Sequence, residues 1–238
     1  GALEDIYFQT EQWNELVSVL LRKSELTEAA EAKKDLLFRV SAIYEEMLSD
    51  PYRAVEIYRA VLEVDAIDAK ALDALERIFL ALGRWEDLLE ILHRKAELTD
   101  DVAARKDIYY VIGAAYDREL DDLTRAVETY QAVLGWDAQD LTSLQCLDSL
   151  YHRLEKWEEL LGILKREVAV VSEPEAQVAL HFRIANLHET ALELVGGAIE
   201  GYRDILAQWP GHEPSLAALE GLIRTDREAV AATAALEP

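Results

Sequence analysis

Apolar residues recur along this chain at the spacing of α-helices. Around the middle of the chain the apolar positions are Trp85, Leu88, Leu89 and Leu92, followed by Ala126, Tyr130 and Leu134. Steps of three and four residues place these side chains on one face of a helix. Short polar breaks separate the apolar stretches. The pattern therefore predicts four helices, over residues 68–82, 85–98, 103–119 and 122–135.

The same pattern returns with a period of 72 residues. Positions with identical residues in three successive periods are Trp13, Trp85 and Trp157; Leu16, Leu88 and Leu160; Ala54, Ala126 and Ala198; Tyr58, Tyr130 and Tyr202; and Leu75, Leu147 and Leu219. No insertion interrupts this register. Because each period holds four helices, we predict two helical hairpins of about 36 residues per period.

The register also sets the expected organisation of the chain. We expect a single solenoid over 1–238, with the end of a truncated hairpin at 1–10 and a terminal helix at 226–238. Successive double repeats would occupy 11–82, 83–154 and 155–225. Neither end has the strongly polar surface of a capping repeat, so we expect a fragment of a longer array.

One hairpin resembles a tetratricopeptide repeat (TPR). The matching positions are Ile112, Gly113 and Tyr116 in its first helix and Ala126 and Tyr130 in its second. Fitting both helices needs one extra residue in the turn near Leu120. The neighbouring hairpin, around 72–96, is more divergent, although it keeps Leu75, Phe79 and Gly83. The resemblance implies an all-α, right-handed superhelical solenoid that is a protein-protein interaction scaffold and not an enzyme.

In that family the first helix of each hairpin lines a concave groove. Counting from the starts of these helices, the candidate peptide-binding residues are Asp35, Phe38, Glu45, Asp107, Tyr110, Asp117, Phe182, Asn186 and Glu189. The aromatic and carboxylate side chains would suit a basic segment, through cation–π contacts and charge pairing. Alternatively, the aromatic residues pack between hairpins and the carboxylates are only solvated.

The chain is strongly acidic. It has 47 Asp and Glu against 24 Lys and Arg, a formal net charge of −23. Such a surface repels phosphate backbones and attracts basic proteins, so we expect a basic protein or peptide partner and no nucleic acid. The same charge could serve only to keep the chain soluble.

The sequence holds no recognisable catalytic or metal-binding motif. His181 and His188 are seven residues apart and could share a helix face, but they occupy positions that other periods fill with Leu37, Tyr109, Tyr44 and Tyr116. We therefore expect core or partly buried histidines there, not a metal pair. We expect no catalytic residues, no metal and no cofactor.

Cysteine content and hydropathy bear on the compartment. Cys146 is the single cysteine, so an intrachain disulfide cannot form. No apolar run approaches the roughly 20 residues that span a bilayer. We expect a cytoplasmic protein without membrane insertion.

Two alternative functions remain open. The chain could be a structural spacer or a self-assembly element that associates through open solenoid ends. It could also be a regulatory part of an enzyme whose catalytic residues lie elsewhere.

Overall fold

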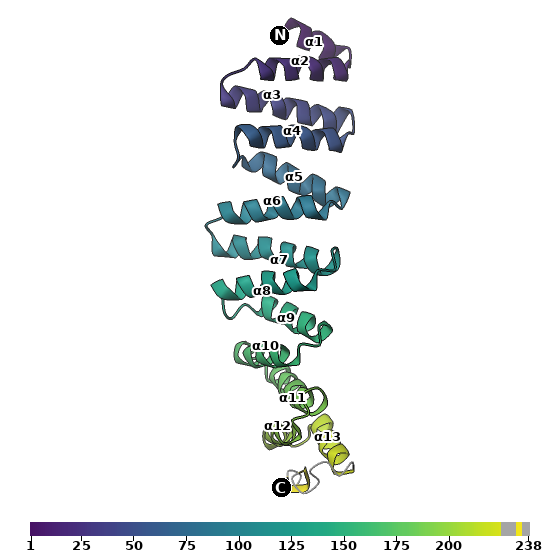
Figure 1. The fold of residues 1–238 in the computed structure, drawn as a ribbon, viewed down its shortest axis with the longest axis vertical. Coiled ribbons are helices and arrows are strands. Elements are labelled where there is room, and N and C mark those ends of the chain that lie inside the picture. The colour runs from purple at the N-terminus through teal and green to yellow at the C-terminus, as the bar shows by residue number, and fades with distance from the viewer. Residues whose placement is uncertain (225–231, 235–238) are drawn as a thin grey trace. The chain divides into compact units, whose positions relative to one another are not determined.

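The computed structural model describes residues 1–224 and 232–234 (Figure 1), and these residues form helices without any strand. The helices are α1 Ala2–Gln9, α2 Trp13–Glu25, α3 Ala30–Ala42, a π-helical turn η1 Ile43–Met47, α4 Pro51–Val64, α5 Ala69–Leu82, α6 Trp85–Leu98, α7 Val102–Arg118, α8 Leu123–Trp136, α9 Leu141–Arg153, α10 Trp157–Val170, α11 Pro174–Thr190, α12 Val195–Gln208 and α13 Glu213–Arg224. The all-α prediction is confirmed. The four helices predicted for the middle period correspond to α5–α8. Apart from 232–234, the terminal helix predicted at 226–238 lies outside the described residues.

The chain divides into two compact units, Gly1–Ile108 and Tyr109–Pro238, and the division falls within α7. In the first unit the helices α1 to α6 pack in chain order, each on the next. In the second unit α8 to α13 pack in the same way. Packing between sequence neighbours is the arrangement by which helical repeats stack into a solenoid.

Small residues let the two helices of a hairpin approach closely. Ala54, Ala126 and Ala198 are completely buried at equivalent positions of three hairpins. The approach is closest at Gly113, where a Cβ atom would lie 2.6 Å from Cζ of Tyr130. A side chain at position 113 would therefore displace the buried tyrosine ring.

One type of turn recurs at the 72-residue period. Glu11, Gly83 and Glu155 have φ values of 54°, 63° and 54°, in the left-handed region. The residue after each donates its N–H to a carbonyl five residues earlier, as in the Arg84 N–Phe79 O bond of 3.0 Å. This is the Schellman arrangement, which favours glycine at the left-handed position. Only one of the three turns has that glycine.

The other turn is wider and also recurs. Leu48, Leu120 and Leu192 each donate the backbone N–H to a carbonyl five residues earlier, at 3.0, 3.1 and 3.1 Å. A left-handed residue follows each leucine: Ser49, Asp121 and Glu193. The widened last turn, of the π type, accommodates the extra residue that the TPR comparison needs near Leu120.

Candidate functional site

A surface pocket of about 560 Å³ lies in the second unit, where α9, α10 and α11 meet. His152 comes from the end of α9 and Trp157, Leu160 and Leu164 come from α10. The remaining lining residues come from α11: Phe182, Arg183, Asn186, Leu187, Thr190 and Ala191. The pocket thus combines aromatic and aliphatic walls with an imidazole, a guanidinium, an amide and a hydroxyl group.

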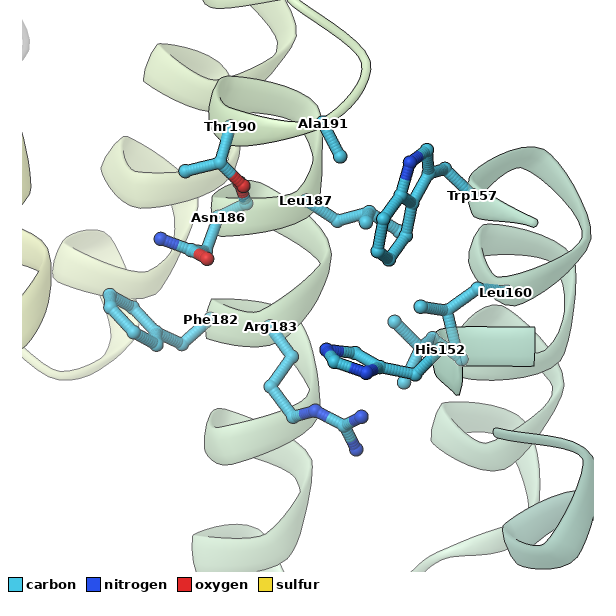
Figure 2. Close-up of a pocket in the computed structure, with 10 residues that line it drawn as sticks. His152, Trp157, Leu160, Phe182, Arg183, Asn186, Leu187, Thr190 and Ala191 are labelled. Atoms are coloured by element: carbon cyan, nitrogen blue, oxygen red, sulfur yellow. The ribbon is translucent and has the colours of Figure 1, made fainter. Parts of the chain in front are cut away.

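Figure 2 shows how these side chains are arranged. Trp157 and Leu187 point toward each other across the space between α10 and α11. Phe182 and Asn186 leave α11 on the side away from α10, and Asn186 is exposed. The His152 ring packs edge-on against Trp157, with ring centroids 5.6 Å apart. The pocket therefore has an apolar interior and a polar rim along α11.

The first unit holds the repeat-equivalent pocket. It has a volume of about 210 Å³ and is lined by Phe8, Trp13, Leu16, Arg39, Ala42, Ile43, Glu46 and Met47. Each of these residues lies 144 positions before a lining residue of the second pocket. Ala191 in place of Met47 widens the second pocket, and Asn186 in place of Ala42 makes its rim more polar. Repeat duplication has thus produced two versions of one site.

Beside the second pocket lies an unusual group of charges. Arg183 donates two hydrogen bonds to Asp148, at 2.6 and 2.7 Å. Glu167 on α10 is 3% exposed, and its Oε1 atom has no hydrogen-bond partner. Burial raises the pKa of Glu167 to about 7, and the negative charge of Asp148 adds to this effect. We define Asp148, Arg183 and Glu167 as the carboxyl cluster.

Sequence reasoning missed the carboxyl cluster, although the repeat register contained the signal. Glu167 stands where the two preceding periods have Lys23 and Lys95. A change of charge sign at one repeat position marks a site where one period differs chemically from the others.

The aromatic residues predicted for the groove are all half-buried. Phe38 packs against Tyr58, with ring centroids 6.1 Å apart, and Phe182 packs against Tyr202 at 5.6 Å. Tyr110 donates its hydroxyl to Oδ2 of Asp140 at 2.5 Å. Each ring therefore has an internal packing role and an accessible edge.

The predicted carboxylates fall into two groups. Glu45 accepts hydrogen bonds from Tyr58 at 2.7 Å and from Arg77 at 2.5 Å, and Glu189 accepts one from Tyr202 at 2.9 Å. Asp117 pairs with Arg153. Asp35 and Asp107 are exposed. Of all nine predicted residues, Phe182 and Asn186 are the two that line the 560 Å³ pocket.

The predicted burial of the two histidines was partly wrong. His181 is exposed, because α11 turns this position outward, and His188 is half-buried against Gly197. Across residues 1–224 and 232–234, no group of three or more His, Cys, Asp and Glu side chains could hold a metal ion. No helix in the same part of the chain is long and apolar enough to cross a membrane.

The comparison with family models supports the helical repeat. Residues 71–106 match the family model for the tetratricopeptide repeat. A search of curated proteins found no match. Among solved structures, YrrB, described as a TPR protein with an unusual peptide-binding site, is 13% identical with a TM-score of 0.42, over 78% of this chain and 91% of that chain. The MamA protein is 15% identical with a TM-score of 0.43, over 73% of this chain and 90% of that chain. A tetratricopeptide repeat protein from Parabacteroides merdae is 13% identical with a TM-score of 0.41, over 98% of this chain and 94% of that chain.

The family match falls on the hairpin of α5 and α6. By its residues, this hairpin resembles the TPR pattern less than the α7–α8 hairpin does. That hairpin closes with the tight Schellman turn at Gly83, whereas the α7–α8 turn carries the extra residue near Leu120. The α5–α6 hairpin has no extra turn residue between its helices, which favours its match to the family model. Residues 71–106 thus match one tetratricopeptide repeat, and the helical pattern of this segment returns every 72 residues along the chain.

Proposed function

We propose that this chain is a scaffold that binds a basic, extended protein segment, with the 560 Å³ pocket of the second unit as an anchoring site. The observation that carries the proposal is the composition of this pocket. The lining combines the ring of Trp157 on the α10 side of α11 with the ring of Phe182 and the exposed amide of Asn186 on the other side of α11. An apolar recess with a few polar groups at its rim is typical of binding sites in proteins.

Each lining group has a role in binding an extended segment. The Asn186 amide offers both a donor and an acceptor, as a peptide backbone requires. The indole face of Trp157 and the ring of Phe182 can take the aliphatic stem of a lysine or arginine, with cation–π attraction to its charged end. The net charge of −23 would raise the association rate of a basic partner.

The other predicted residues belong to the same proposal. Asp35 and Phe38, and likewise Asp107 and Tyr110, would offer a carboxylate and an aromatic edge at equivalent positions of other hairpins. The hydrogen bonds of Glu45, Asp117 and Glu189 to tyrosine or arginine side chains fix the orientation of these carboxylates. A fixed carboxylate loses less entropy on binding than a free one.

A displayed library of random peptides tests the proposal. We expect selection at about 0.05 M salt to enrich lysine and arginine, and binding to weaken at about 0.3 M because salt screens charges. Asn186→Ala should weaken the selected peptides by about tenfold, the effect of losing a buried hydrogen bond. Asn14→Ala, which removes an exposed amide from α2 in the first unit, is the matched control and should leave binding unchanged.

Two results would contradict the proposal. If Asn186→Ala and Asn14→Ala had equal effects, the pocket would not be the anchoring site. If no peptide were enriched and the chain associated with itself as its concentration rose, the self-assembly function would be favoured.

A further inference from the structure

At one repeat position the first two periods carry a positive charge and the third carries a carboxyl group. In the first period Lys23 of α2 donates to Glu4 of α1 at 2.9 Å, and Arg39 of α3 contacts the other oxygen of Glu4 at 3.1 Å. In the second, Lys95 of α6 contacts Asp73 of α5 at 2.6 Å and pairs also with Glu76. In both periods, a lysine ammonium group thus neutralises a carboxylate of the preceding helix.

The third period reverses this charge. Asp148 corresponds to Glu4 and Glu76, and Arg183 corresponds to Arg39, but Glu167 replaces the lysine. Two carboxyl groups therefore lie near one guanidinium, and Arg183 donates two hydrogen bonds to Asp148. Glu167 is left buried with an unpartnered oxygen.

Burial and a neighbouring negative charge both favour the protonated form of a carboxyl group. The charged groups that act on Glu167 are Asp148 from α9 and Arg183 from α11, the two helices that pack against α10. The pKa of Glu167 is raised to about 7 by burial and Asp148, whereas the Lys23 hydrogen bond lowers the pKa of Glu4 to about 2. The first-period cluster thus holds an ionised carboxylate, whereas the third-period cluster holds a carboxyl group that favours its proton.

The cluster adjoins the binding pocket. Arg183 lines that pocket, and Leu164, which lines it too, is one helical turn before Glu167 on α10. When Glu167 holds its proton, Asp148 and Arg183 neutralise each other. When Glu167 releases its proton to solvent, the cluster carries one net negative charge beside the pocket.

We propose that Glu167 is a proton-controlled switch that sets the charge beside the pocket, so that a cationic side chain binds more tightly as the pH rises through neutrality. The protonation of Glu167 can be measured in the absence of any ligand. Its effect on affinity rests on the proposed function of the pocket.

The first experiment follows the proton directly in the whole chain. Carboxyl carbon NMR should show one glutamate signal that titrates near neutral pH, and this signal should disappear in Glu167→Gln. Glu158→Gln, which removes an exposed carboxyl group from the same helix, should leave it in place. A Glu167 signal that titrates near the ordinary value of about 4.3 would overturn the proposal.

Thermal unfolding gives a second readout without ligand. Because the pKa of Glu167 is raised in the folded state, the folded chain holds the proton more tightly than the unfolded chain, and stability falls as the pH rises toward about 7. Relative to Glu167→Gln, the wild-type chain should lose roughly 5 °C of Tm between pH 5 and pH 8. Glu167→Lys restores the residue of the other periods and should also abolish this loss. An equal loss in all three chains would overturn the proposal.

Binding of the lysine-containing peptides selected above tests the link to the pocket. The wild-type chain should bind them several-fold more tightly at pH 8 than at pH 6, and Glu167→Gln should not. Since histidine side chains also titrate in this range, the measurement is repeated in His152→Phe, which carries the residue of the first-unit pocket. If the Glu167 signal titrates near neutral pH but peptide affinity does not change with pH, the link to the pocket is rejected and the raised pKa of Glu167 stands. Failure of every peptide to bind would reject the proposed function alone.

Discussion

At the scale of single residues, identical backbone positions are occupied by residues of very different suitability. The left-handed position of the Schellman turn holds Gly83 in one period and Glu11 or Glu155 in the others, with φ values within ten degrees of one another. The left-handed conformation costs a residue with a Cβ atom about 1–2 kcal/mol. The fold therefore tolerates local strain at two of these three turns.

Replacing Glu155 by glycine should relieve that strain. We expect Glu155→Gly to raise the free energy of unfolding by about 1 kcal/mol, less than the full strain because glycine also gains entropy in the unfolded chain. Denaturant unfolding followed by circular dichroism measures the change. The control Lys165→Gly places glycine at an exposed position in the middle of α10 and should lower stability by about 1 kcal/mol. A loss of stability in both variants would contradict the strain at Glu155.

Single residues also differ in whether their role could be predicted from the sequence. The extra turn residue near Leu120 was visible because it interrupts the TPR pattern. The protonation of Glu167 was not predicted, because it depends on burial and on Asp148 and Arg183, which the fold brings together from two other helices. The two pocket residues Phe182 and Asn186 were found, while their partners Trp157 and His152 were not.

At the scale of helices, boundaries follow capping chemistry. Asp50 and Asp122 precede α4 and α8, and their carboxylates accept the N–H groups of Arg53 and Arg125 at 3.1 and 3.0 Å. The equivalent residue before α12 is Leu194, which has a similar backbone conformation but offers no side-chain cap and is 54% exposed. Polar breaks and apolar spacing together located the middle helices to within one residue at each end.

Supplying the missing cap should stabilise α12. Leu194→Asp is expected to raise the free energy of unfolding by about 1 kcal/mol, since an aspartate there can accept a backbone N–H and its charge favours the helix N-terminus. Leu194→Asn should give most of this gain and Leu194→Ala none, which separates capping from the loss of an exposed leucine. Equal stability of the three variants in denaturant unfolding would argue against a capping deficit.

At the scale of the whole molecule, charge and connectivity dominate. The 72-residue period predicted a solenoid of helical hairpins from sequence, because stacking each hairpin on its neighbours requires the same apolar positions every time. Charge, in contrast, is free to vary between periods. The sign of a charged side chain can differ between periods while the apolar positions stay the same, as it does between Lys95 and Glu167, and so charge is less predictable than the apolar core.

The net charge of −23 should make thermal stability depend on salt. Like charges repel more strongly in the compact state than in the unfolded chain, and salt screens this repulsion. We expect Tm to rise by several degrees between about 0.01 M and about 0.2 M sodium chloride. Scanning calorimetry measures this change, with sucrose as a control for effects that are not electrostatic. A fall in Tm would mean that ion pairs such as Lys23–Glu4 outweigh the repulsion.

The packing of each helix on its neighbours in sequence also has a mechanical consequence. Within a unit, the contacts that resist extension lie between consecutive helices. A pulling force on the two ends of a unit would then load these junctions in series, so that the weakest one yields first and lengthens the chain by a single helix. Such a unit would dissipate tension in small successive steps and would recover hairpin by hairpin once the load fell.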